Sequence, residues 1–266
     1  MIRFEQVTKI LGGQKILDDV TLKIEKGEIF TIIGSSGSGK SVTLKHIVRL
    51  LTPNQGKVFV DDIEVSAAEG AELAKARSLF GYLFQGGALL GWMSVFDNVA
   101  LPLREKTRTS EAEIEKRVME TLKMVGLEND GHKFPNEISG GMQKRAGLAR
   151  AIIHRPQIIL YDEPTSGLDP VTARTIDALI HRLNAELGIT SVVVTHDLQG
   201  AVLISDRIAM LVRGKFVEPS TPEAFIKTTH PEVRAFLDAQ FIPPEGMAGQ
   251  WQSAVAVGSK TPRTNG

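Results

Sequence analysis

Short apolar runs bounded by turn and charged residues predict the strands of this chain. Buried parallel strands are apolar over most of their length, because other elements cover both of their faces. Such runs predict buried strands at residues 28–33, 80–84, 158–161, 191–194 and 208–212. We expect these segments to pair in a mainly parallel core sheet.

Apolar and polar positions nearly alternate in other segments, as they do in strands with one buried face. This pattern covers residues 2–7, 20–24 and 57–60. It predicts an antiparallel β subdomain formed largely by the N-terminal part of the chain. With the helices described next, the strands indicate an α/β fold.

Apolar residues recur at helical spacing in four segments, as on one face of an amphipathic helix. These segments are residues 44–51, 114–125, 145–152 and 233–237. The region at about 86–155 separates two of the buried strands and contains the helix at 114–125. We therefore expect this region to be an inserted helical subdomain.

A Pro/Gly/Ser-rich segment begins with Pro243-Pro244-Glu245-Gly246. This composition is typical of chain that lacks a packed core. We expect one domain at residues 1–240, followed by a flexible tail at residues 241–266.

Composition excludes several classes of function. Lys plus Arg and Asp plus Glu both number 31, so bulk charge does not favour nucleic-acid binding. The chain has no cysteine, which excludes disulfides and thiolate metal sites. Its N-terminal residues lack an apolar targeting core, and no run approaches the roughly 20 apolar residues of a spanning helix. We expect a cytosolic protein.

The segment Gly34–Ser41 reads GSSGSGKS and carries the first candidate chemistry. It fits the pattern GxxxxGK followed by Ser or Thr, in which backbone N–H groups surround phosphates, the lysine reaches the β and γ oxygens, and the hydroxyl binds Mg²⁺. A strand precedes it and a helix follows, as such a loop requires. The alternative is a Gly/Ser turn with an incidental lysine. The residues expected to bind ATP here are Gly34, Ser35, Ser36, Gly37, Ser38, Gly39, Lys40, Ser41 and Val42.

Two carboxylates, Asp162 and Glu163, directly follow the buried strand at 158–161. Open α/β sheets bind their ligands at the carboxyl ends of the strands. We expect Asp162 to bind Mg²⁺ with Ser41, and Glu163 to orient and polarise an attacking water. The alternative is a solvated Asp-Glu-Pro turn.

Two more polar residues follow buried strands. His196 comes after the strand at 191–194, where it can donate a hydrogen bond to a γ-phosphate. Gln85 follows the strand at 80–84, so its amide can contact Mg²⁺ or the water while its backbone leads into the helical insertion. For His196 the placement is the argument, whereas a lone Gln at a strand end is usually incidental, and only the neighbouring motifs favour a role for Gln85.

The segment Ser139-Gly140-Gly141 places small residues directly before the helix at 145–152. Exposed N–H groups at a helix start suit a phosphate. An ordinary glycine-rich helix start is the alternative.

This ordered set, with ISGGM at 138–142 and Ser166-Gly167-Leu168-Asp169, resembles the nucleotide-binding subunit of ABC transporters over residues 2–228. The resemblance implies a P-loop NTPase fold and a homodimer that sandwiches two ATP molecules. It also implies that Asp169 helps to connect the two sites. The residues that would face Ser139, Gly140 and Gly141 of the partner are Lys40, Ser41, Gln85, Asp162, Glu163 and His196.

The chain departs from the family pattern in two places. Ile138 and Met142 replace the ends of the usual LSGGQ signature, which leaves its phosphate-facing Ser and glycines intact. Leu11 stands where an aromatic residue often stacks on adenine, so the base would gain only an apolar contact.

A finer resemblance rests on residues 83–105 and 140–145, which are similar to the ATPases of Mla-type and Mce-associated lipid transporters. It implies two copies of a membrane permease, an Mce-domain lipid-binding protein, a STAS-domain protein and a peripheral site on the cytoplasmic face of the inner membrane. One alternative is the ATPase of a small-molecule importer. Another is an ABC protein of translation or DNA repair, which the single motif set and the lack of basic surplus disfavour.

Apolar residues gather after Gln85 and predict either a groove for a permease helix or part of the helical core. We expect most of these side chains to be buried and one or two to be exposed. They are Leu89, Leu90, Trp92, Met93, Val95 and Phe96.

Overall fold

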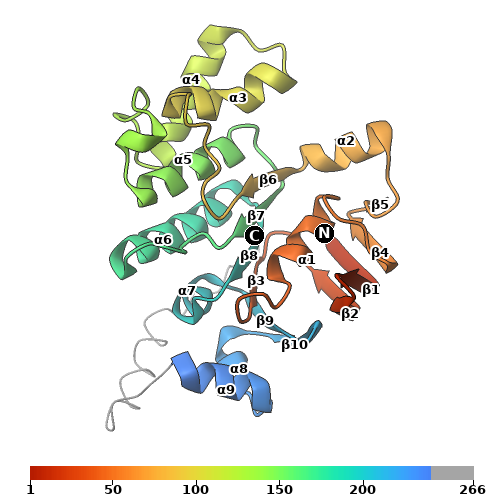
Figure 1. The fold of residues 1–266 in the computed structure, drawn as a ribbon. Coiled ribbons are helices and arrows are strands. Elements are labelled where there is room, and N and C mark those ends of the chain that lie inside the picture. The colour runs from red at the N-terminus through yellow and green to blue at the C-terminus, as the bar shows by residue number, and fades with distance from the viewer. Residues whose placement is uncertain (241–266) are drawn as a thin grey trace, which may run out of the picture.

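A computed structural model describes residues 1–240 of the chain, which form two sheets and a set of helices (Figure 1). The tail expected at residues 241–266 lies outside the described residues.

The larger sheet has six strands in the order β10-β9-β3-β8-β7-β6. Every neighbouring pair is parallel except β10 with β9. The mainly parallel sheet is therefore confirmed, with strand ends that differ by at most one residue from the expected ones. Its strands are β3 (Ile29–Ile33), β6 (Phe80–Leu83), β7 (Ile158–Asp162), β8 (Thr190–Thr195), β9 (Arg207–Val212) and β10 (Lys215–Ser220).

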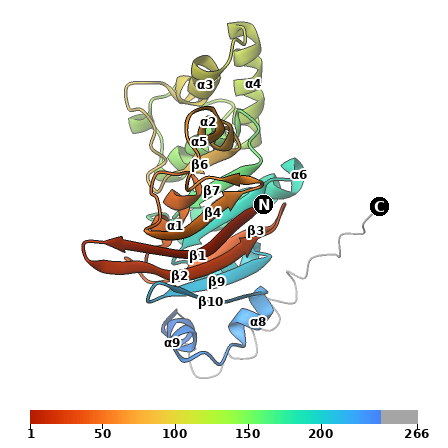
Figure 2. The same cartoon turned by 90° about the vertical axis from the view of Figure 1, so that its right-hand side faces the viewer.

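The smaller sheet has four strands in the order β2-β1-β4-β5, and its pairs are antiparallel (Figure 2). This confirms the antiparallel strands predicted from alternating polarity. Its strands are β1 (Ile2–Leu11), β2 (Gln14–Ile24), β4 (Gln55–Val60) and β5 (Ile63–Glu64).

Helices cover the larger sheet and fill the segment between β6 and β7. In this segment lie α3, α4 and α5, whose apolar side chains share one core with α6. Beyond β10, α8 and α9 complete the described chain. The helices are α1 (Lys40–Ile47), α2 (Gly70–Ser78), α3 (Val95–Lys106), α4 (Glu111–Met124), α5 (Gly140–Ile152), α6 (Pro170–Leu187), α7 (Leu198–Ile204), α8 (Pro222–Ile226) and α9 (Pro231–Gln240), with a 3-10 turn at Pro135–Glu137.

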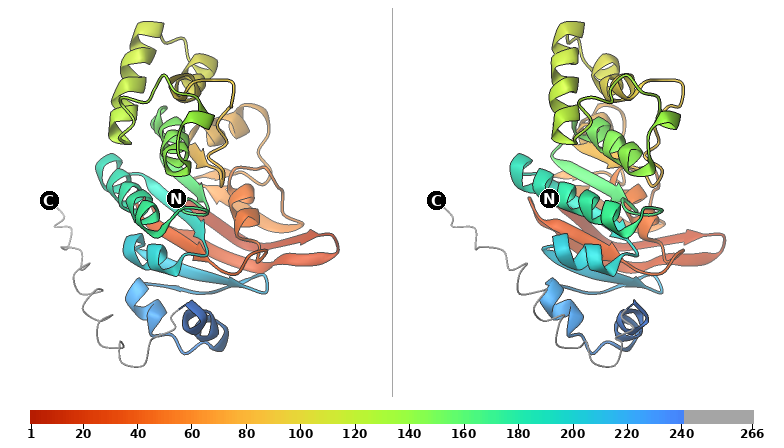
Figure 3. Two further views of the ribbon diagram at one scale, coloured as in Figure 1. Left: turned by 60° about the vertical axis from the view of Figure 1, so that its left-hand side comes forward. Right: turned by 90° about the vertical axis from the view of Figure 1, so that its left-hand side faces the viewer.

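The two faces of the larger sheet belong to different cores. Because side chains alternate along a strand, Ile158 and Leu160 of β7 pack in the core that contains α1, whereas Ile159 and Tyr161 pack in the core that contains α6. Figure 3 shows α6 lying along this second face. A strand buried on both sides accounts for the continuous apolar run in the sequence.

The helix predicted at residues 44–51 is shorter in the structure, because α1 ends at Ile47. Arg49 adopts a left-handed φ of 58°, and the N–H groups of Leu50 and Leu51 both donate to the carbonyl of Lys45. These bonds close the helix end. The apolar spacing in the sequence therefore extends beyond Ile47, where the helix ends.

Candidate functional site

Parallel pairing brings the predicted chemistry to one edge of the sheet. Ile33 pairs with Thr195, and Asp162 pairs with Val194, so β3, β7 and β8 end side by side. The glycine-rich loop follows β3, Glu163 follows β7 and His196 follows β8. Residues from three distant parts of the sequence therefore meet at the carboxyl ends of neighbouring strands.

Lys40 is a buried cation at the start of α1, with 6% of its surface exposed. Its Nζ donates to the carbonyls of Gly34, at 2.9 Å, and Ser35, at 3.0 Å. It also lies 3.4 Å from Glu163 Oε1. The ammonium is thus fixed inside the arc of the loop, where it can offset the charge of a bound anion.

Glu163 lies between two cationic or polar partners. Its Oε1 faces Lys40, and its Oε2 is 2.8 Å from Nδ1 of His196. A carboxylate only accepts, so this contact requires the proton on Nδ1. The Glu163 side chain is 13% exposed, whereas that of His196 is 59% exposed. A largely buried carboxylate beside a solvent-exposed histidine is suited to accept a proton from water.

Ser41 and Asp162 form the second part of the cluster. The Ser41 hydroxyl donates to Asp162 Oδ1 at 2.7 Å, and the Tyr82 hydroxyl donates to Asp162 Oδ2 at 3.2 Å. Burial, with Asp162 beside it, raises the pKa of Tyr82 well above its usual value, so the phenol remains a donor. Hydroxyl and carboxylate oxygens together suit Mg²⁺.

Sequence reasoning missed Tyr82, although a signal was present. Strand β6 pairs in parallel with β7, so the end of β6 lies beside Asp162. That signal was the hydroxyl of a tyrosine near the end of an otherwise apolar strand.

The loop at residues 34–39 fits a phosphate-bearing nucleotide. Ser38 Oγ is buried without a hydrogen-bond partner and thus needs one from a ligand or water. Gly39 has a φ of 104°, and a Cβ there would lie 2.7 Å from Ile16 Cγ2. The loop needs glycine for both its conformation and its close approach to β2. Beside it lies a cavity of about 350 Å³ lined by residues 14–16, 35–38 and 210–214.

The other predicted residues lie farther from this cluster or show other contacts. Leu11 is 39% exposed and does not line the cavity, which Gln14, Lys15 and Ile16 border instead. Gln85 is in a turn with an exposed side chain, and its carbonyl accepts from Lys144 Nζ.

The segment Ser139–Gly141 starts α5 on another part of the molecule. Ser139 caps the helix by accepting from the N–H of Met142, and a Cβ on Gly141 would lie 2.5 Å from Thr172 Cγ2. Within the described part of the chain, no hydrogen bond or ion pair joins this segment to residues 34–41. One copy of the chain therefore does not bring all the predicted residues together.

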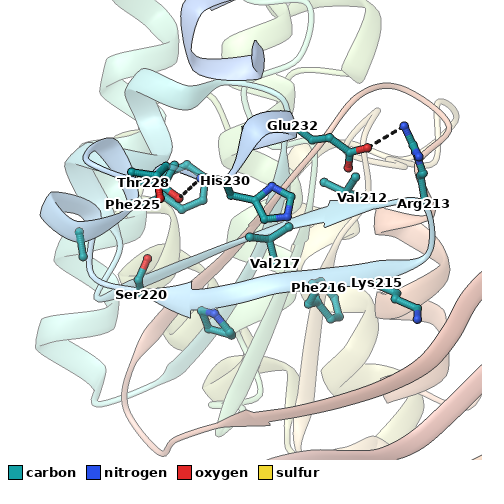
Figure 4. A pocket seen from close by; sticks show the side chains of 13 residues that line it. Val212, Arg213, Lys215, Phe216, Val217, Ser220, Phe225, Thr228, His230 and Glu232 are labelled. Atoms are coloured by element: carbon teal, nitrogen blue, oxygen red, sulfur yellow. Dashed lines mark hydrogen bonds and ion pairs between the residues drawn. The ribbon is translucent and has the colours of Figure 1, made fainter. Parts of the chain in front are cut away.

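A larger cavity, of about 1010 Å³, lies between β9, β10 and the two C-terminal helices. Figure 4 shows His230 above Val217 in this cavity and the ion pair between Arg213 and Glu232 at its rim. None of the predicted site residues lines it. Size alone therefore does not identify the site, and the glycine-rich loop with its buried cation is the better candidate.

A family model described as ABC transporter matches residues 17–166. This chain belongs to the ABC transporter family. It is an ATP-binding subunit that hydrolyses ATP, as the family domain and the structural neighbours described next indicate.

Two relatives of this ABC subunit carry names that point to different cargo. The probable ribonucleotide transport ATP-binding protein mkl of Mycobacterium leprae is 46% identical over 247 residues, which cover 93% of this chain and 71% of that protein. The methionine import ATP-binding protein MetN of Carboxydothermus hydrogenoformans is 43% identical over 84% of this chain and 66% of its own length.

Solved structures share the fold of this ABC subunit. A dimeric ATP-binding cassette in a post-hydrolysis state, bound to ADP and Pi, has a TM-score of 0.76 at 39% identity and covers 84% of this chain and 99% of its own. The cbiO1 protein of Clostridium perfringens, part of an ABC transporter complex, has a TM-score of 0.77 at 27% identity over 90% of this chain and 98% of its own. The ABC ATPase fold predicted from the sequence is confirmed.

No helix within residues 1–240 combines the length and the hydropathy that crossing a bilayer requires.

A cluster of three charged side chains, of which Asp177 is buried, lies next to His196 in this ABC subunit. Arg174 of α6 donates to Asp197, the residue that caps α7, and lies 3.2 Å from Asp177 Oδ2. Burial raises the pKa of Asp177 to about 6, opposed by Arg174 and reinforced by Asp197. A Cβ on Gly200 would lie 2.8 Å from Asp177 Oδ2, so α7 approaches closely only with glycine there.

Asp177→Asn should raise the stability of the subunit at pH 8. The native carboxyl keeps its proton to about pH 6, whereas the unfolded one ionises near 3.8. The stability that the protonated Asp177 carboxyl gives the native state is therefore fully present below the pKa of the unfolded chain. It is lost as the pH rises through the native pKa of about 6. We expect the free energy of unfolding to rise by roughly 1–3 kcal/mol at pH 8 and to change little at pH 4.

Denaturant unfolding at both pH values measures this change. Glu186→Gln is the matched control, because Glu186 lies on the same helix with a side chain that is 54% exposed. Equal effects of Asp177→Asn at pH 4 and pH 8 would contradict the pKa assignment.

Proposed function

We propose that this subunit powers lipid transport between the membranes of a cell envelope. In this proposal two copies of the chain bind beneath two copies of a permease, at the cytoplasmic face of the inner membrane. An Mce-domain lipid-binding protein and a STAS-domain protein are further partners. The proposal rests on residues 83–105 and 140–145, which resemble lipid-transporter ATPases.

Two lines of support underlie the proposed dimer. A dimeric cassette in a post-hydrolysis state is among the similar structures. Within one copy, Ser139–Gly141 starts a helix in the region between β6 and β7 and has no polar contact with the loop at residues 34–39. We infer that these residues complete the site of a second copy.

The position of the Glu163 carboxylate, between Lys40 and His196, carries the proposed assignment of roles. Glu163 orients the attacking water and accepts its proton, Lys40 binds phosphate oxygens, and His196 turns its N–H from Glu163 to the γ-phosphate when ATP binds. Ser41 and Asp162, with the side chain of Gln85 as a third ligand, would hold Mg²⁺. The ion, when bound, neutralises charge on the phosphate oxygens.

Trp92 is the proposed contact to the permease. Its surface is 78% exposed, whereas Val95 is buried and Leu89 and Phe96 pack against the helical core. The expectation of one or two exposed side chains agrees with Trp92, whereas the expectation that most of the stretch is core is met only in part, because Leu90 and Met93 are half-buried outside the core. The buried Asn98 donates to the carbonyls of Leu90, Met93 and Ser94, so the segment that presents Trp92 is fixed. An exposed tryptophan on a fixed segment is suited to anchor a partner helix.

Trp92→Glu should detach or uncouple the permease, because burying a charge in an apolar contact is costly. The affinity for ATP should stay within about twofold of wild type. Co-purification of the permease and transport in membranes measure the effect. Leu187→Glu is a control at another exposed apolar residue. Intact transport by Trp92→Glu would refute the groove assignment.

A small-molecule importer is the second candidate, and the similarity to a methionine import protein favours it. Purification of the tagged subunit from detergent-solubilised membranes, with mass spectrometry of bound proteins and lipids, separates the two. A permease with an Mce-domain protein and phospholipid supports lipid transport. A permease with a solute-binding protein supports the importer, and recovery only with ribosomes or DNA contradicts both.

A further inference from the structure

Lys144 is a buried cation that contacts two motifs of the candidate site. It lies on α5 with 5% of its surface exposed. Its Nζ donates to the carbonyl of Gln85 and, at 3.1 Å, to the carbonyl of Glu163. One side chain thus joins the turn after β6 to the residue after β7.

The contact with Glu163 falls on a strained backbone. Glu163 has a φ of 51°, a left-handed conformation that costs about 1–3 kcal/mol for most residues and persists only where the surroundings fix it. Its N–H donates to the carbonyl of Val194 at 2.9 Å, and its carbonyl accepts from Lys144 and from the N–H of Ser166 at 3.3 Å. Lys144 is therefore one of the groups that fix the backbone of Glu163, from which the carboxylate extends.

Among the side chains that the structure describes, none forms an ion pair with Lys144 within 4.0 Å, and its Nζ contacts the two carbonyls instead. Burial lowers its pKa, and the charges of Glu163 and Asp162 oppose that shift. A buried ammonium with carbonyl partners is expensive, and apolar replacements of such groups are often neutral or stabilising. Stability alone gives little reason for a lysine at this position.

The same helix also contacts the segment that follows Gln85. Arg150 donates to the carbonyls of Gly87, at 2.9 Å, and Ala88, at 2.8 Å. A Cβ on Gly147 would lie 2.9 Å from the Gly87 carbonyl. The segment at 85–88 thus lies close against α5, and a displacement of one reaches the other.

We propose that Lys144 is a positioning residue that fixes the backbone of Glu163 and ties it to the segment beginning at Gln85. A displacement of that segment then reorients the carboxylate that acts on water. The proposal rests on the proposed role of Glu163 and adds a residue that would transmit movement to it.

Lys144→Met in the full-length chain tests the proposal. We expect kcat for ATP hydrolysis to fall by about 10–100-fold, as for a catalytic group displaced by about 1 Å. The KM for ATP and the melting temperature should stay near the wild-type values, because the phosphate loop and the core are unchanged. Lys144→Arg, which keeps the charged donor, should recover part of the rate.

Arg117→Met is the matched control, since Arg117 on α4 also donates to a backbone carbonyl, that of Ile153, but contacts neither Glu163 nor the segment at 85–88. Its basal kcat should stay within about threefold of wild type. A double-mutant cycle with Glu163→Gln gives the decisive comparison, because Lys144→Met should have no further effect once the carboxylate is absent.

Several results would overturn the proposal. These are an unchanged kcat in Lys144→Met, a parallel loss of kcat and melting temperature that Lys144→Arg does not relieve, and full additivity with Glu163→Gln. If Lys144→Met fails to fold, Lys144→Gln is compared in the same assays and judged by the same criteria. Normal turnover by Glu163→Gln alone would instead remove the catalytic assignment of Glu163, and this proposal with it.

Discussion

Glu163→Gln should lower kcat for ATP hydrolysis by about 10²–10⁴-fold, the usual contribution of a general base. Glutamine keeps the size of the side chain but cannot accept the proton from water. Lys40 and the glycine-rich loop remain, so ATP should still bind and the dimer should stay closed around it. Steady-state hydrolysis, ATP binding and size-exclusion chromatography with ATP measure these three effects.

Glu186→Gln removes a carboxylate from an exposed position on α6 and serves as the control. It should turn over ATP at the wild-type rate. Normal hydrolysis by Glu163→Gln, or a loss of ATP binding equal to the loss of kcat, would contradict the proposed role of Glu163.

Lys40→Ala should weaken ATP binding by about 10–100-fold or more, because a charge-assisted contact of this kind contributes about 1.5–3 kcal/mol. The buried ammonium is the cation inside the loop, and its loss also leaves Glu163 without the partner at 3.4 Å. Hydrolysis should therefore fall with binding. Calorimetric titration with ATP and Mg²⁺ measures the affinity.

Lys45→Ala, on the exposed face of the same helix, is the matched control and should bind ATP normally. Equal affinities of Lys40→Ala and Lys45→Ala would remove Lys40 from the binding site. The two variants separate ATP binding from ATP hydrolysis, because Glu163→Gln should spare binding and Lys40→Ala should not.

The sequence predicted the architecture well because each element has a local signature. Strand β3 is entirely buried, and its residues form a continuous apolar run. The alternation in β1 and β2 reflects one buried face. Several elements lacked such a clear signature and were not predicted individually, namely the helices α2, α3, α6, α7 and α8 and the strands β5 and β10.

The candidate site likewise contains residues that the sequence predicts and residues that only the packing of the sheets places there. The glycine-rich loop, Asp162, Glu163 and His196 each follow a strand, so parallel pairing brings them together. Leu11 was expected beside the nucleotide from family resemblance alone, whereas Gln14–Ile16 border the cavity. Which residue of the N-terminal hairpin lies there depends on how the two sheets pack, and no local pattern records that packing.

By itself, the sequence determined most of the strands, four of the helices (α1, α4, α5 and α9), the ATPase family and the residues at the strand ends, because each depends on local spacing. Only the tertiary structure decided that Tyr82 donates to Asp162, that Asp177 is buried beside Arg174, and that Lys144 joins the carbonyls of Gln85 and Glu163. The Tyr82 and Lys144 contacts connect residues that lie far apart in the chain. The Lys144 contacts also use backbone carbonyls, which every residue type supplies, and the burial of Asp177 comes from the packing of α7 against α6, so the sequence contains no motif for them.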